Sequence, residues 1–203
     1  MNEYKIILSK YIPENAVEII YSWIMQYKFH LRISRSRTTK LGDYRPPVRK
    51  HTHKISINYN LNKYAFLITL VHEIAHLIVW DKYKKSVKPH GKEWKTEFKY
   101  LMSNFFDDKI FPKDLSNALS VYLENAFASS VTDLDLTRIL NNYDNKSDFI
   151  LLEELPQNTV FKMHNGRIFK KQEKLRKRYR CLCLESKKEY LFNPLAQVVP
   201  VNT

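Results

Sequence analysis

The sequence predicts an α+β protein in two parts, a helical part with a small antiparallel sheet over residues 1–150 and a small antiparallel β-module over residues 151–203. Apolar residues recur with helical spacing through most of the first part, whereas short runs of alternating apolar and polar residues fill the second. Hydrophobic residues make up 44% of the chain, which suffices for a packed core and excludes wholesale disorder.

The cysteine content and the apolar runs limit the class of protein. Cys181 and Cys183 are the only cysteines, so a disulfide framework and a four-cysteine zinc ribbon are both excluded. Membrane spans need about 20 apolar residues, and no uninterrupted run is that long. The first residues also lack the pattern of a signal peptide. We therefore expect a cytoplasmic monomer that does not associate with membranes.

The first elements are expected before residue 60. Pro13 opens a helix that ends near Lys28. Residues 29–34 alternate between apolar and polar, and residues 54–59 do so again, which predicts two strands. The basic segment between them contains a glycine and two adjacent prolines, so it is interpreted as a long hairpin connection.

A central buried helix is predicted over residues 63–80, because apolar residues occur on nearly all its sides. Asn60 and Asn62 are candidate N-caps. The length would also suit a membrane span, but two histidines and a glutamate in its middle argue against lipid. Further helices are expected over residues 91–105, 111–126 and 133–143.

The β-module is predicted from a change of pattern after residue 150. Asn165-Gly166 is typical of a type I′ hairpin turn. The short β-like runs cover residues 160–163, 167–169, 179–184, 189–192 and 197–199.

The central helix carries the pattern His-Glu-Ile-Ala-His over residues 72–76. His72 and His76 are four residues apart and share a helix face, so both imidazoles can bind one zinc ion. Glu73 lies about 100° round the helix, where its carboxylate can reach a water molecule. Bound zinc polarises a scissile carbonyl and acidifies water, and a carboxylate can take the proton. Because buried unpaired His and Glu side chains are costly, we favour a metal site over a chance pattern.

A hydrolytic zinc site needs a third protein ligand. The metzincin pattern is excluded, because Val79 and Lys82 stand where it requires a glycine and a histidine. Glu93 or Glu97 on the next helix would give a thermolysin-like arrangement. We favour His90, which precedes that helix and matches the other two ligands in softness.

The net charge of +13 is concentrated in two segments. Residues 32–54 and residues 167–180 each carry a net charge of +7, whereas residues 55–150 are neutral. Such segments are typical of contact with a polyanion, most often nucleic acid, although solvated basic loops are the competing interpretation. The candidate nucleic-acid-binding residues are Arg35, Arg37, Lys40, Arg45, Arg49, Lys50, Lys170, Lys171, Lys174, Arg176, Lys177, Arg178 and Arg180.

These basic segments contain no base-reading motif, so the expected DNA contacts are independent of sequence and sensitive to salt. Tyr44 lies among the basic residues and could stack on a base. His51 and His53 are interpreted as surface residues of a strand.

The metal-binding pattern, together with His90-Gly91 and Trp94, resembles the SprT-like metalloproteases. Trp23 and residues 31–37, 41–44 and 55–58 extend the resemblance over roughly residues 10–105. The resemblance implies a zincin-like domain that binds one zinc ion through His72, His76 and His90, with Glu73 as the general base.

The resemblance also implies cleavage of DNA-bound or DNA-crosslinked proteins, that is, DNA–protein crosslink repair. It implies contact with single-stranded or junction-like DNA, and association with the nucleoid in a bacterium. Many members of the family end in a four-cysteine zinc ribbon, of which the β-module would be a metal-free counterpart. Two alternatives stay open. One is a non-catalytic DNA-binding or transcription-associated protein with a structural zinc, and the other is a peptidase unrelated to nucleic acid.

Overall fold

The fold is described from a computed structural model, and the chain divides into two compact units, Met1–Asp144 and Asn145–Thr203. The predicted α+β class is confirmed, with helices around a small sheet in the first unit and an antiparallel sheet in the second. The structure describes residues 3–37, 39–48, 51–106, 109–124, 133–144 and 149–201.

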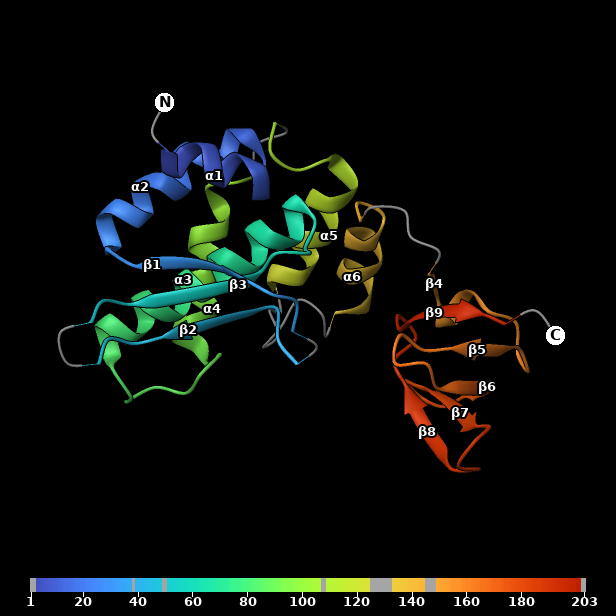
Figure 1. Cartoon of the computed structure of the whole chain (residues 1–203). Coiled ribbons are helices and arrows are strands. Elements are labelled where there is room, and N and C mark those ends of the chain that lie inside the picture. The colour runs from blue at the N-terminus through green and yellow to red at the C-terminus, as the bar shows by residue number, and fades with distance from the viewer. Residues whose placement is uncertain are drawn as a thin grey trace. The chain divides into compact units, whose positions relative to one another are not determined.

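The first unit is built around α3, against which the sheet and α4 pack (Figure 1). Most of the predicted helices lie where the periodicity places them. The helix α1 had no counterpart among the sequence expectations, and its buried residue is Leu8. The elements are α1 (Glu3–Tyr11), η1 (Glu14–Ala16), α2 (Val17–Tyr27), β1 (His30–Ser34), β2 (Gly42–Arg45), β3 (Lys54–Asn58), α3 (Lys63–Tyr83), α4 (Lys92–Ser103), α5 (Lys113–Glu124) and α6 (Leu134–Asn141).

The sheet of this unit is mixed, with the strand order β1-β3-β2. The expected hairpin between the first and last of these strands is wrong, because β1 and β3 are parallel and Leu31 pairs with Ile55. The intervening segment instead forms β2, which is antiparallel to β3 and pairs Tyr44 with the same Ile55. Alternation in a sequence reports which face of a strand is buried, but it does not report the direction of the strand.

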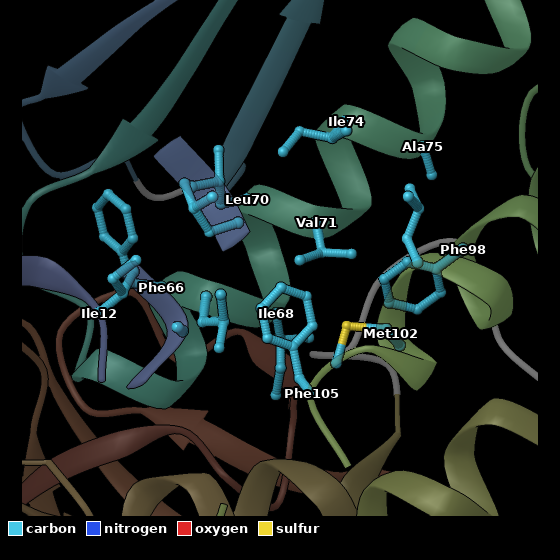
Figure 2. Packing of buried hydrophobic residues seen from close by; sticks show 14 of the residues in the cluster. Ile12, Phe66, Ile68, Leu70, Val71, Ile74, Ala75, Phe98, Met102 and Phe105 are labelled. Atoms are coloured by element: carbon cyan, nitrogen blue, oxygen red, sulfur yellow. The ribbon is translucent and has the colours of Figure 1, made fainter. Parts of the chain in front are cut away.

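Helix α3 is the core helix of the unit. Its N-cap is Asn62, whose side chain accepts hydrogen bonds from the backbone N–H groups of Tyr64 and Ala65. Its length and apolar composition would allow it to cross a membrane, but 67% of that apolar stretch is buried inside the protein. Figure 2 shows Ile68 and Val71 of α3 in the same buried cluster as Phe98 and Phe105.

The second unit is a sheet with the strand order β4-β9-β5-β6-β7-β8, in which every pair is antiparallel. Both cysteines are free thiols buried in its core. Its elements are β4 (Ile150–Leu151), η3 (Leu152–Glu154), β5 (Val160–Lys162), β6 (Ile168–Lys174), β7 (Tyr179–Cys183), β8 (Glu189–Phe192) and β9 (Gln197–Pro200).

The hairpin between β5 and β6 differs from its predicted turn type. A type I′ turn needs a positive φ at both central residues, but only Gly166 has one, at 84°. The N–H of Gly166 donates to the carbonyl of Met163 at 2.8 Å. The glycine is therefore the single left-handed residue of this turn.

Candidate metal centre and its cleft

Three imidazoles meet at one point in the first unit. His72 and His76 project from α3, and His90 lies in the turn before α4. The Nε2 atom of His72 lies 3.2 Å from that of His76 and 3.1 Å from that of His90, and the His76 and His90 atoms are 2.8 Å apart. The structure thus brings His90, and not Glu93 or Glu97, to the two histidines of the helix.

The turn that carries His90 is tight and left-handed. His90 has a φ of 57°, which is uncommon for a residue with a side chain. The N–H of Gly91 donates to the carbonyl of Lys88 at 3.0 Å, and a Cβ atom on Gly91 would lie 2.9 Å from that carbonyl oxygen. A glycine is therefore required beside the third histidine.

Trp94 of α4 packs against all three imidazoles. Its ring centroid lies 4.5 Å from that of His72, 5.3 Å from that of His76 and 4.7 Å from that of His90. Its indole N–H donates to the backbone carbonyl of His72 at 3.4 Å. Because Trp94 is fully buried, it fixes the relative positions of the rings.

The histidine cluster is chemically suited to a cation. Burial lowers the pKa of His72 to about 2 and that of His76 to about 4, and it also lowers the pKa of His90. The imidazoles are therefore neutral, as metal ligands must be. Three neutral rings whose Nε2 atoms converge cannot all donate to one another, whereas a metal ion satisfies all three lone pairs.

The number of ligands fits a hydrolytic zinc site. Zinc accepts imidazole nitrogen, and catalytic zinc sites keep three protein ligands and an open position. Within the described ranges, no further His, Cys, Asp or Glu joins His72, His76 and His90.

Glu73 lies in the same cleft as the histidines and is 7% exposed. Burial is the main reason that its pKa rises from 4.5 to about 8. Asp43 adds to the rise, whereas the backbone N–H of Tyr44, which donates to the carboxylate, opposes it. A pKa near neutrality suits a group that must accept and then return a proton.

Strand β2 covers Glu73 closely, a contact that no pattern in the sequence indicates. A Cβ atom on Gly42 would lie 2.5 Å from Oε1 of Glu73 and 2.8 Å from Cγ2 of Thr69. Gly42 therefore leaves the space that the carboxylate occupies. The cleft as a whole has a volume of about 460 Å³ and extends from β2 to the turn at His90.

Several of the basic candidates between residues 35 and 50 are already engaged in contacts within the protein. The guanidinium of Arg37 donates to Asn58 Oδ1 at 2.8 Å and to the hydroxyl and carbonyl of Ser56, both at 3.1 Å. Arg37 thus ties its loop to β3. Lys40 and Arg45 both pair with Asp43, at 2.7 and 2.8 Å.

Arg35 is exposed and has no ion pair within the described residues, while Arg49 and Lys50 lie outside those residues. Tyr44 is not free to stack on a base, because it is half-buried and its hydroxyl bonds Nδ1 of His53 at 2.9 Å. The expectation that His53 is a surface residue of a strand is also wrong. The residue precedes β3, and its ring packs edge-on against Trp80. Local sequence patterns do not indicate these contacts, because they arise from tertiary packing.

The second group of basic candidates lies on β6, on β7 and in the turn between them. Lys170 is half-exposed, and Arg180 pairs with Glu173 at 3.0 Å and with Glu189 at 3.6 Å. Lys171 is buried. The exposed candidates are Lys174, Arg176, Lys177 and Arg178.

The ammonium of Lys171 donates to the backbone carbonyls of Leu152 and Leu155, so it serves the fold of the β-module. Lys171→Met is expected to destabilise that unit by about 1–3 kcal/mol, because buried carbonyls lose their partner. The neighbouring half-exposed Lys170→Met should change stability by less than about 0.5 kcal/mol. Denaturant unfolding, with hydrogen exchange read at the amides of β6, measures both. Equal stability of the two variants would contradict the structural role of Lys171.

The fold and the three-histidine cleft define a candidate metallopeptidase domain. Comparison with protein families shows that residues 15–114 match the model of the SprT-like family. The match covers just under half of the chain, so residues 15–114, within the first unit, are assigned to the SprT-like family. Membership is consistent with a metallopeptidase, and the family is typically zinc-dependent. Comparison with curated proteins and with solved structures gave no significant match.

Proposed function

We propose that this protein is a zinc-dependent endopeptidase that cleaves proteins bound or crosslinked to DNA, acting as a monomer in the cytoplasm or at the nucleoid. The observation that carries the proposal is the joint presence of three convergent imidazoles and one buried carboxylate in a single cleft. The match to the SprT-like family supports the same chemistry.

The three histidines would hold the zinc ion, which supplies a Lewis acid that polarises the scissile carbonyl and acidifies water. Glu73 accepts a proton from the attacking water at its carboxylate and returns it to the leaving amine. The N–H of Tyr44 and the open space at Gly42 orient that carboxylate. The cleft therefore contains groups for metal binding and for proton transfer, and the contacts that position the carboxylate.

A purely structural zinc is the alternative function. Structural zinc sites are almost always closed by four protein ligands. The described part of the chain supplies three, and it places an acid beside them instead of a fourth ligand. The three-ligand count therefore favours an enzyme.

The DNA part of the proposal rests on charge. Residues 32–54 and residues 167–180 each carry eight basic side chains against one acidic side chain. Several of the basic ones are exposed, at Arg35 and around the turn of residues 174–178. Contacts of this kind neutralise phosphates without reading bases.

Coupling a substrate to DNA is expected to speed its cleavage. A small protein joined covalently to a single-stranded oligonucleotide should be cut about 10- to 100-fold faster than the same protein uncoupled, because the bound strand raises its effective concentration. The advantage should shrink as salt is added. The control is the uncoupled protein mixed with free oligonucleotide. Equal rates for coupled and uncoupled protein at low salt would favour a peptidase unrelated to nucleic acid.

Gly42→Ala is expected to lower the rate of cleavage about 100-fold while zinc binding persists. The new methyl group would overlap the carboxylate of Glu73 and push it away, and a misplacement of about 1 Å can cost that much in rate. Ser22→Ala is the control, since Ser22 is exposed on α2 and does not line the cleft. Cleavage rates and zinc content of both variants test this. Wild-type activity in Gly42→Ala would show that the carboxylate tolerates the displacement.

A further inference from the structure

The sheet of the first unit has a second hollow on the face that points away from α3. Side chains alternate along a strand, so one face of each strand packs on the helix and the other lines this hollow. Its volume is about 370 Å³. The lining residues are His30, Arg32, Ser34, Arg35, Arg37, Asp43, Arg45, Lys54, Ile55 and Ser56.

The hollow carries an excess of positive charge. Five of its lining side chains are Arg or Lys and one is acidic. That acid, Asp43, is already paired with Lys40 and Arg45. Arg32, Arg35 and Lys54 have no ion pair or side-chain hydrogen bond in the described segments. These three exposed cations are therefore available to an anion from outside the chain.

The cations are held on a rigid surface. The register of β1 and β3 places His30 beside Lys54 and Arg32 beside Ser56, on strands about 4.8 Å apart. Arg37 is fixed to Ser56 and Asn58 and forms one wall. A flexible loop would have to be ordered before it could bind, whereas this array is already in place.

We propose that this outer sheet face binds the phosphate backbone of a nucleic-acid strand. Guanidinium groups match phosphate oxygens in a bidentate geometry, and hydroxyl groups such as that of Ser34 also contact phosphates. No Phe, Tyr or Trp lines the hollow, so it offers no large aromatic surface on which bases could stack. Every lining residue except Ile55 is polar or charged, which suits a phosphodiester chain better than a peptide that needs side-chain pockets.

The phosphate-binding face and the histidine cleft share one strand. On β2, Gly42 faces Glu73, while Asp43 and Arg45 line the hollow. A bound strand would lie one sheet away from the cleft, and proteins attached to that strand would be held near it. Only this consequence rests on the proposed peptidase function, because binding itself requires no catalysis.

The test measures binding of a fluorescent single-stranded oligonucleotide of mixed sequence to the zinc-loaded full chain. Arg32→Ala/Lys54→Ala is expected to bind about 25-fold more weakly at 0.1 M salt, since each lost phosphate contact costs about 5-fold there. The slope of log K against log salt should shrink by about 1.4. Lys95→Ala/Lys99→Ala, which removes two exposed charges from α4, should match the wild type in both measurements.

Unchanged affinity and slope in the Arg32/Lys54 variant would overturn the proposal. It would also be overturned if the wild type bound a polyglutamate peptide of equal charge as tightly as the oligonucleotide. Thermal unfolding checks each variant, and the exposed Arg35→Ala, with an expected loss of about 5-fold, replaces the double variant if that variant is unfolded. Repeating the measurement on Glu73→Gln separates binding from cleavage, so failure of the peptidase proposal leaves this result intact.

Discussion

Replacing Glu73 with glutamine is expected to lower peptide-bond cleavage by about 100- to 10,000-fold while one zinc ion per chain is retained. Glutamine keeps the size of the side chain, and its amide oxygen can still accept the N–H of Tyr44 that Glu73 accepts. It cannot take a proton from water. The substitution therefore removes the base and leaves the three imidazoles and their packing on Trp94 unchanged.

The measurement pairs zinc content with the rate of cleavage of an unfolded model protein. Glu93→Gln is the matched control, because Glu93 lies on α4 outside the histidine cluster. We expect its rate to equal that of the wild type. If both variants lose activity together, the loss reflects general damage and the assignment of Glu73 as the base would be wrong.

The second large effect is expected from His90→Ala. Loss of a residue that only orients a ligand lowers metal affinity by roughly 10- to 100-fold, and loss of the ligand itself should lower zinc affinity by more than that. Two helix histidines cannot complete a three-ligand site. Zinc should also cease to stabilise the protein, whereas the wild type should gain about 4 kcal/mol at a free zinc concentration 1,000 times its Kd.

Zinc titration and thermal unfolding with and without zinc measure both effects. His51→Ala is the control, since His51 is an exposed histidine of the same unit. Its zinc affinity and its zinc-dependent stabilisation should match the wild type. Undiminished zinc affinity in His90→Ala would mean that another side chain supplies the third ligand.

Local periodicity predicted most of the first unit and its histidine cluster. The spacing of His72 and His76 fixes their common helix face, and a glycine after His90 marks the turn that returns the third imidazole. The direction of β1 and β3 could not be predicted in this way, because parallel and antiparallel strands alternate alike. Whether β1 and β3 run parallel depends on pairing between residues 24 positions apart in the sequence, such as Leu31 and Ile55.

Net charge along the chain was a weaker guide, because it does not report burial. Arg37 is engaged with Ser56 and Asn58, and Lys171 is buried beneath the carbonyls of η3. A signal existed for Lys171, since it lies two residues from buried Phe169 and so shares the inward face of β6. The role of Gly42 had no such signal, as it arises where β2 meets Glu73.

The most direct test of the central claim is a self-cleavage time course of the wild type and Glu73→Gln, each zinc-loaded, with and without single-stranded DNA. We expect fragments from the wild type, formed faster when DNA is present, and none from Glu73→Gln in either condition. Fragments that appear from Glu73→Gln at the wild-type rate would contradict the central claim.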